Sequence, residues 1–457
     1  MASCRRMERV NKMSKYNSND ILDNFSAHTE FFVYDGKLYI FDHEHHCYVV
    51  VPSPRIPTTL MKSMPLGLRR EIPNGVFDDA KTTLLREPLY EVDLEELKLK
   101  GVYYINLKNG VFDVRTGKLI KGKKAEELVK SLRFTYALNF SYSPNVALKE
   151  KDMYLQFLRD SLDYDTCPEK SILLSEILGV SVSSLRDVRK ATFLVGATRS
   201  GKSIIADLVK RVHFPKSCVS FLGFHQLGGN FETIKLLHSR VNICKEISTR
   251  KIPRTEIIKQ LISHEDVYLQ EKMQVGFPGV PHCQLLSCGN ILPQFGEMDA
   301  SGNEALIDRM VVLHFGHSIP TDKLDRQLVD KLWAERDLIF SLALDALAAL
   351  YQRNYEFTMP ADSKALLEGY AQQSRSFEAF VEECCQLEGK IHSDTLFKAY
   401  HQYCKDNCFK SYSDHEVRAY IGNSLPQVLH KKFTLNGNYR WGWEGLSLKV
   451  EEIIKED

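Results

Sequence analysis

The stretch ATFLVGATRSGKS at residues 191–203 constrains the fold of this chain more than any other feature. An apolar run ends at Gly196, four residues follow, and Gly201, Lys202 and Ser203 complete the pattern G-x-x-x-x-G-K-[ST]. The next segment, SIIADLVK, has the apolar spacing of a helix. A strand, a glycine-rich turn and a helix in this order form a loop whose N–H groups point into one concavity and bind phosphate.

The residue types in this loop predict the ligand that it holds. The predicted binding residues are Gly196, Ala197, Thr198, Arg199, Ser200, Gly201, Lys202 and Ser203. Lys202 would neutralise the β and γ phosphates, and the Ser203 hydroxyl would bind magnesium. We therefore expect ATP and Mg²⁺ as cofactors. The alternative, a chance glycine-rich turn, is disfavoured by the strand and helix on either side.

Further apolar segments around the loop predict an α/β core. Strands are expected at residues 192–195, 218–222, 241–244, 284–288 and 310–315. Helical segments lie between most of them, and such alternation is typical of a mostly parallel sheet covered on both faces.

Three polar residues flank these strands in an order that suits an ATPase. Glu246 and Asn290 each follow a strand, and α/β sheets bind ligands at the carboxyl ends of their strands. Glu246 would bind Mg²⁺ or polarise the attacking water, and Asn290 would reach the γ-phosphate or that water. Arg309 precedes the last strand and would stabilise phosphoryl transfer at the nucleotide of a neighbouring subunit. Each residue alone is a common turn or surface residue, so the ATPase interpretation depends on the order of all three after the phosphate loop.

Composition limits the classes of protein that remain. The chain has 457 residues, 44% hydrophobic and 26% charged, which suits two or three globular domains. A net charge of +1 means that nucleic-acid binding would depend on local basic patches. No apolar run has the length of a membrane span, and the N-terminus lacks the apolar core of a signal peptide. We expect a cytoplasmic protein with no membrane partner.

Two groups of histidine and cysteine raise the alternative of a zinc site. They are DHEHHC at residues 42–47, and His401, Cys404 and Cys408. We interpret the first as a surface or structural hairpin, because neighbouring strand residues face opposite ways. The second lies among aromatic residues and fits an amphipathic core stripe. The other cysteines are scattered, as expected for buried thiols in a reducing compartment.

The rest of the chain divides at changes of pattern. Hairpins are predicted at Asp35-Gly36 and Asn109-Gly110, and a long helical run follows Pro320. The expected domains are an N-terminal α+β region of unknown role (1–94), a segment preceding the core (95–182), the ATPase core (183–320), a helical connector (321–376) and a C-terminal domain (377–457).

The C-terminal domain has the outline of a winged helix. A capping box at residues 413–416 opens a helix after an earlier helical stretch, and two strands surround Asn436-Gly437. Basic residues gather here, namely Lys410, Arg418, Lys431, Lys432 and Arg440. We expect them to contact duplex DNA. A protein-docking module of the same fold is the alternative.

The order of these motifs resembles a known family. The phosphate loop, NICKE, LLSCGNILPQF and DRMVVLHF resemble superfamily 3 helicases, specifically the D5-like and phage P4 alpha-like replication helicases of viruses, phages and mobile elements. YINLKNGVFDVRTGKL and LRFTYALNFSYSPN resemble the segment before their helicase core. FVEECC, LFKAYHQYCKDN and NYRWGWEGLSL resemble their C-terminal domain, so the resemblance covers roughly residues 95–448.

The resemblance implies an AAA+-like core in a hexameric ring that hydrolyses ATP between subunits and moves along single-stranded DNA. Lys202 and Ser203 match the Walker A pair, Glu246 the Walker B acid, Asn290 the sensor asparagine and Arg309 the arginine finger. In the family a hairpin between the Walker B acid and the sensor enters the ring channel. YLQEKMQVGFPGVPH takes that place here, with Lys272 near its tip, where it would meet DNA phosphate.

Two departures from the family pattern leave open which residue activates water. Ser200 stands where asparagine is common, and Lys245 stands where many members have a second acid beside Glu246. Neither change removes a group that the chemistry requires.

We therefore expect an ATP-dependent replicative DNA helicase of a phage, satellite or mobile element, which also acts as an origin initiator. An alternative is a DNA-binding initiator whose ATPase drives assembly only, with unwinding by another helicase. A small-molecule kinase using the same loop is a further alternative. It would not need Arg309, the hairpin or the basic C-terminal domain.

Overall fold

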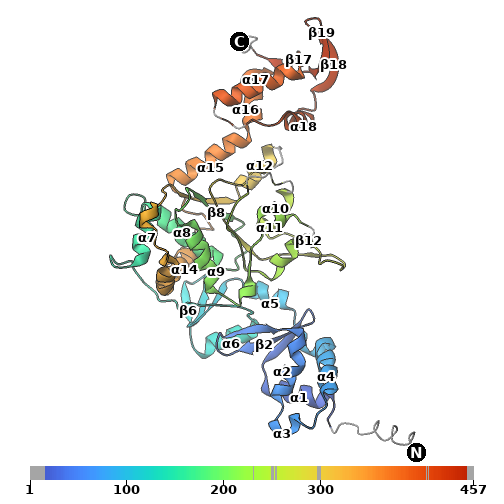
Figure 1. Cartoon of the computed structure of the whole chain (residues 1–457), viewed down its shortest axis with the longest axis vertical. Helices are drawn as coiled ribbons and strands as arrows, with labels where there is room; N and C mark the ends of the chain where they lie inside the picture. The colour runs from blue at the N-terminus through green and yellow to red at the C-terminus, as the bar shows by residue number, and fades with distance from the viewer. Residues whose placement is uncertain are drawn as a thin grey trace, which may run out of the picture.

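The computed structural model describes residues 16–229, 231–248, 252, 255–295, 300–407, 409 and 411–449. The chain is elongated, with the N-terminal region at one end, the central α/β core in the middle and the C-terminal domain at the other end (Figure 1). Helix α15 (Ala361–Ser374) leads from the core to the C-terminal domain.

The N-terminal region combines a small sheet with helices. Its antiparallel strands are β1 (Phe31–Tyr34), β2 (Lys37–Asp42) and β3 (Cys47–Val51), in the order β1-β2-β3. The accompanying helices are α1 (Ser18–His28), α2 (Ile56–Ser63), α3 (Leu66–Arg69), α4 (Asn74–Arg86) and α5 (Leu94–Gly101). Asp35 and Gly36 turn the first hairpin with φ values of 50° and 63°, as the Asp-Gly pair predicts.

A second sheet joins the N-terminal region to the core. Its strand order is β6-β5-β4-β7-β9. The strands are β4 (Tyr104–Leu107), β5 (Gly110–Asp113), β6 (Lys118–Ile120), β7 (Ala137–Leu138) and β9 (His213–Phe214), and helix α6 (Lys123–Ser131) lies beside them. The hairpin predicted at Asn109-Gly110 joins β4 and β5. Strand β9 comes from beyond the phosphate loop, so the core contributes directly to this sheet.

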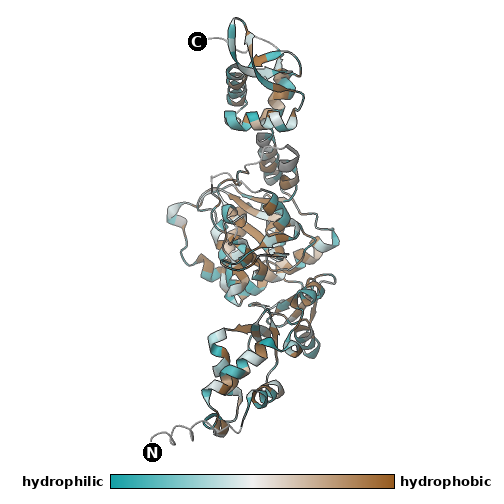
Figure 2. Ribbon diagram, turned by 90° about the vertical axis from the view of Figure 1, so that its right-hand side faces the viewer, coloured by the Kyte–Doolittle hydropathy of each residue, from teal (hydrophilic) through white to brown (hydrophobic). Residues whose placement is uncertain are grey.

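The central sheet is parallel throughout, which confirms the predicted α/β class. Its order is β10-β11-β14-β8-β15. The strands are β8 (Ala191–Gly196), β10 (Val219–Ser220), β11 (Val241–Cys244), β14 (Gln284–Gly289) and β15 (Met310–Phe315). All five lie at or within two residues of the predicted positions, and β10 is shorter than expected. Figure 2 shows these apolar strands in the middle of the core.

Alternate residues of the central strands face two separate hydrophobic cores. Leu194 and Leu313 belong to one core, and Phe193 and Val312 belong to the other, as expected for side chains of period two. The first core contains α7 (Met153–Leu162), α8 (Glu169–Ser181), α9 (Lys202–Val212), α13 (Leu328–Ala334) and α14 (Arg336–Gln352). The second contains α10 (Phe224–Leu227), α11 (Thr255–Ser263) and α12 (Ala300–Ile307).

Helices α8 and α14 approach unusually closely within the first core. A Cβ atom at Gly179 would lie 2.5 Å from the carbonyl oxygen of Ala343. Near this contact, Glu176 is fully buried and accepts hydrogen bonds from Arg353 and from the backbone N–H of Thr358. The long helix after Pro320 is thus part of the core of the molecule.

The C-terminal domain has its own hydrophobic core, which includes Phe377, Tyr400 and Trp443. Its helices are α16 (Ser376–Cys384), α17 (Ser393–Asp406) and α18 (Asp414–Ser424). Its strands are β16 (Cys385–Gln386), β17 (Lys390–His392), β18 (Leu429–Leu435), β19 (Asn438–Glu444) and β20 (Ser447–Leu448), and β17-β19-β18 form one sheet. The predicted capping box is present at the start of α18. In the described part of the chain, no helix combines the length and apolar character that crossing a bilayer requires.

Candidate nucleotide-binding site

The loop between β8 and α9 requires glycine at two positions. Gly196 has a φ of 140°, and a Cβ atom there would lie 2.0 Å from the carbonyl oxygen of Phe315 in β15. Gly201 has a φ of 98°, and its Cβ atom would lie 2.7 Å from the ring of Phe157 in α7. Both glycines therefore allow the loop to pass close to its neighbours in a conformation that favours glycine.

The backbone amides of the loop are available to a ligand. From Thr198 to Ser203, no amide has a hydrogen-bond acceptor among the described residues. The loop is nevertheless held in place, since the Ala197 amide donates to Phe315 at 3.0 Å and the Arg199 carbonyl accepts from Ile319 at 3.1 Å. Fixed, unpaired N–H groups at the start of a helix form an anion-binding site.

Lys202 is a buried cation at the start of α9. Its side chain is folded against the loop, where Nζ donates to the Gly196 carbonyl at 2.9 Å, to the Ser200 hydroxyl at 3.0 Å and to the Ala197 carbonyl. Burial lowers the pKa of Lys202, and no carboxylate lies within ion-pair distance of it among the described residues. A buried cation without a carboxylate partner is stabilised by a bound anion.

A cavity of about 410 Å³ opens beside the loop. Its walls are the loop, helix α7 through Phe157 and Asp160, and the segment after β15 through Ile319 and Asp325. The volume lies in the range of small-molecule sites. Sequence reasoning found the loop and missed the other two walls, because an amphipathic helix and a short connection carry no signal that marks them as ligand contacts.

Glu246 and Asn290 lie at the same edge of the sheet as the loop. Strands β8, β11 and β14 run parallel, so their carboxyl ends share one edge. Glu246 follows β11, Asn290 follows β14, and both are exposed. The missing side chain of Gly289 lets Ile247 approach, since a Cβ atom there would lie 2.8 Å from the Ile247 Cβ. This contact brings the segments that carry Glu246 and Asn290 together.

The carboxylate that accompanies Lys245 was not predicted from the sequence. The Lys245 ammonium forms an ion pair with Asp207 of α9, the helix that begins at Lys202. The pair joins the end of β11 to the phosphate-loop helix and neutralises the charge of Lys245. Asp207 is thus a carboxylate close to the strand end at which a second acid was missing.

Arg309 lies at the opposite edge of the sheet. It precedes β15, its carbonyl accepts from the Ala191 amide at 2.8 Å, and Ala191 is the first residue of β8. The five steps along β8 to Gly196 correspond to roughly 16 Å, so Arg309 is far from the loop of its own chain. Its guanidinium donates to the Ser263 hydroxyl at 3.0 Å and to the Ala305 carbonyl.

The hairpin predicted between Glu246 and Asn290 is present. Strands β12 (Val267–Leu269) and β13 (Phe277–Gly279) pair in antiparallel fashion, and Lys272 lies exposed in the connecting turn. Two apolar residues of the same turn, Met273 and Val275, are also exposed, at 95% and 91%. The tip therefore presents one cation and a group of exposed apolar side chains.

The basic residues of the C-terminal domain differ in how far they are neutralised. Lys431 pairs with Glu444, and Arg440 pairs with Asp394 at 3.4 Å. Lys432 lies over the ring of Trp441.

The remaining members of this basic set are Arg418 and Lys410. Arg418 is exposed on α18 and lies over the ring of Phe397 at 5.3 Å. Lys410 lies outside the described residues. Lys432 and Arg418 are thus the two members with no carboxylate partner among the described residues.

In the two groups of histidine and cysteine, histidines contact carboxylate and aromatic side chains. His45 bonds to Asp42 at 3.1 Å and stacks on Phe214 at 3.6 Å between ring centroids, and Cys47 is buried. His401 pairs with Asp414, and Cys408 lies outside the described residues. Across the described ranges, no three His, Cys, Asp or Glu side chains form a group suited to a metal ion.

Two segments of the chain match protein-family models. Residues 65–163 match the family described as D5 N terminal like. Residues 194–305, from β8 through the hairpin to α12, match a family of unknown function, DUF5906. The chain therefore carries a D5 N-terminal-like segment followed by a DUF5906 segment.

Similarity over most of the chain is weak. No curated protein matches the chain. Two solved apo structures of the NrS-1 C terminal region are similar at 13% and 14% identity, each covering 78% of this chain and 99% of the other, with TM-scores of 0.39 and 0.38. Scores this low do not demonstrate a common fold.

Proposed function

We propose that this chain is an ATP-dependent replicative DNA helicase of a phage, satellite or mobile element, and that it also acts at a replication origin. The observation that carries the proposal is the loop from Gly196 to Ser203, with its unpaired amides and the buried ammonium of Lys202 beside a cavity. The match of residues 65–163 to the D5 N terminal like family supports it, because it covers the segment that resembles replication helicases before their core.

The residues of the loop fit ATP and magnesium. The amides and Lys202 would hold the β and γ phosphates, and the Ser203 hydroxyl and Glu246 carboxylate would hold Mg²⁺, which supplies charge neutralisation when bound. Asn290, at the same sheet edge, would orient the attacking water.

The position of Arg309 favours a ring of identical subunits. Because it lies roughly 16 Å from its own loop along the sheet, it would serve the nucleotide of the next subunit, and a closed ring, which we propose to be a hexamer, supplies one such arginine to every site. In that ring, the β12–β13 hairpin would place Lys272 in the central channel, on the path of single-stranded DNA.

The C-terminal domain would have a role of its own. We propose that the C-terminal domain is a winged helix that contacts duplex DNA, mainly through Arg418 and Lys432, while the ion pairs of Lys431 and Arg440 would have to open on binding. Of the predicted connector (residues 321–376), α13 and α14 pack in the first hydrophobic core, so α15 would connect the ATPase to this domain. The protein would work in the cytoplasm.

The test is strand displacement on a forked DNA, with ATP hydrolysis measured on the same preparation. Lys202→Ala should abolish both activities. The matched control is Lys210→Ala in the last turn of the same helix, where the side chain is exposed, and it should retain both.

The alternatives give different results in this assay. DNA-stimulated hydrolysis without unwinding would favour an initiator whose ATPase drives assembly only. Hydrolysis that is indifferent to DNA would contradict a DNA motor and favour a small-molecule kinase. Wild-type hydrolysis by Lys202→Ala would refute the assignment of the site.

A further inference from the structure

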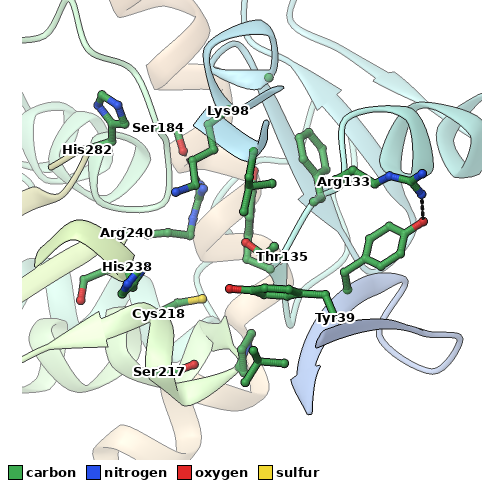
Figure 3. A pocket seen from close by; sticks show the side chains of 18 of the residues that line it. Tyr39, Lys98, Arg133, Thr135, Ser184, Ser217, Cys218, His238, Arg240 and His282 are labelled. Atoms are coloured by element: carbon green, nitrogen blue, oxygen red, sulfur yellow. Dashed lines mark hydrogen bonds between the residues drawn. The ribbon is translucent and has the colours of Figure 1, made fainter. Parts of the chain in front are cut away.

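A second cavity lies on the opposite side of the core from the phosphate loop. Its volume is about 450 Å³, and it opens between the N-terminal region and the central core. Strands β2 and β3, helix α5 and residues 132–136 form one wall, and residues 215–218, 237–240 and His282 form the other (Figure 3). None of the phosphate-loop residues line it.

The charges around this cavity are unbalanced. Lys37, Lys98, Arg133 and Arg240 line it, and no aspartate or glutamate does so among the described residues. Lys37 and Lys98 have carboxylate partners outside the lining, at 3.1 Å and 2.6 Å. Arg133 and Arg240 have no carboxylate partner within the described part of the chain. The cavity is therefore positively charged.

Arg240 is held rigidly with part of its guanidinium unpaired. It donates to the Ser184 hydroxyl at 2.5 Å and to the Val182 carbonyl at 3.1 Å, and it lies 3.2 Å from the centroid of the Tyr136 ring. Its Nε atom is buried and has no hydrogen-bond partner, so an anion would contact the terminal nitrogens, each of which carries a further N–H. Arginine that is fixed by stacking and has donors to spare is well suited to bind an anion.

His282 lines the same cavity as a neutral ring. Arg186 donates to its Nε2 atom, so the ring proton is on Nδ1, which is buried and has no partner. Burial and the charge of Arg186 lower the pKa of His282 to about 2, so the ring stays neutral. The ring therefore adds no charge to the lining, and its enclosed Nδ1 atom is not placed to contact a ligand in the cavity.

Aromatic and apolar side chains form the rest of the lining. Tyr39 of β2, Phe134 and Tyr136 contribute rings, and Val50 and Leu237 contribute aliphatic surface. In Figure 3, the side chains of Tyr39, Lys98 and Arg240 point into the cavity. Arg240 lies against the Tyr136 ring and Arg133 over the Tyr48 ring, so cations and rings lie side by side in the lining, which suits a ligand that combines an anionic group with a planar apolar body.

We propose that this cavity binds a nucleoside monophosphate, with the phosphate near Arg240 and Lys98 and the base against the Tyr39 side. The volume is in the range of sites for ligands of this size. The proposal does not depend on the helicase function, because it uses none of the residues of the phosphate loop. A ligand here would contact both the N-terminal region and the core, and would hold them together.

The binding test uses full-length Lys202→Ala protein, in which the phosphate loop is impaired. Isothermal titration calorimetry with AMP should show one site, while adenosine and inorganic phosphate should each bind at least tenfold more weakly. Equal binding of adenosine would refute the role of the cations, and equal binding of phosphate would refute the role of the rings. Absence of AMP binding would refute the site, whatever the result of the helicase assay.

Two variants and a control locate the binding. Lys98→Gln should weaken AMP binding about tenfold, the loss of one charged hydrogen bond. Tyr39→Ser should weaken it through loss of the ring. Lys108→Gln removes an exposed lysine outside the cavity and should leave AMP binding unchanged. Unchanged binding in both Lys98→Gln and Tyr39→Ser would place AMP elsewhere and overturn the proposal.

Covalent labelling provides a measurement that does not depend on variant stability. Photolysis of 8-azido-AMP with the same Lys202→Ala protein, followed by peptide mapping, should label the peptide that contains Tyr39. Labelling confined to the loop from residue 196 to residue 203 would overturn the proposal.

Discussion

Replacing Lys272 with alanine removes one exposed positive charge from the tip of the β12–β13 hairpin. Among the described residues Lys272 has no ion-pair partner, so its whole charge is available to a DNA phosphate. One phosphate contact contributes about 0.7 to the slope of log affinity against log salt for single-stranded nucleic acid. From 50 to 200 mM salt, that slope corresponds to about a 2.6-fold change in affinity.

The same variant distinguishes one bound subunit from a ring. If a single hairpin contacts the strand, the slope should fall by about 0.7, and if six equivalent hairpins contact it, the fall approaches 4. The assay is fluorescence anisotropy with a labelled oligothymidine at four salt concentrations, using non-hydrolysable ATP analogue throughout. Lys108→Ala, which removes an exposed lysine from the β4–β5 turn, is the matched control.

Either of two results would refute this reasoning. An unchanged slope in Lys272→Ala would remove the lysine from the DNA path. An equal fall in Lys108→Ala would show that the effect is one of general charge. Met273→Ser provides a further comparison, since loss of an apolar contact should weaken binding with no change in slope.

Three further predictions concern the site and the core. Arg309→Ala should bind nucleotide but not hydrolyse it. Mixing this variant with Lys202→Ala should restore part of the ATP hydrolysis, because hybrid interfaces then combine an intact loop with an intact arginine. No recovery at any mixing ratio would contradict an arginine supplied by a neighbour. Gly179→Ala should destabilise the chain in urea, because overpacking against the Ala343 carbonyl costs about 1–3 kcal/mol and exceeds the gain of about 1 kcal/mol in helix propensity. Burial lowers the pKa of His213 from 6.5 to about 3, so the unfolded chain binds more protons below pH 6.5 and stability should fall as the pH falls. The loss is about 1.4 kcal/mol per pH unit between pH 6 and 4, and His213→Phe should show a shallower dependence in chemical denaturation at several pH values.

Sequence reasoning succeeded where the structure is local. The Asp35-Gly36 turn, the capping box at Ser413 and the five central strands each depend on a few adjacent residues, and all are present. The loop glycines were also predictable, because positive φ angles and close approach are properties that only glycine provides.

Long-range pairing could not be predicted in the same way. The ion pair between Asp207 and Lys245 joins residues far apart in the sequence, and so do those that neutralise Lys431 and Arg440. The second cavity combines residues from Lys37 to His282, and no sequence pattern connects them. The distance between Arg309 and its own loop depends on the parallel pairing of β15 with β8, which places Arg309 beside the start of β8. That pairing is known only from the structure.

Helix α9 gives the molecule a direct mechanical connection between its two five-stranded sheets. It begins at Lys202 among the loop amides, ends at Val212 and passes without a linker into β9, which pairs with β7. Its eleven residues form a rod of roughly 16 Å. If the loop binds a nucleotide as proposed, a shift of this helix on nucleotide exchange would move β9 and β7 by a similar amount, and would carry the state of the loop to the N-terminal side of the molecule as a displacement.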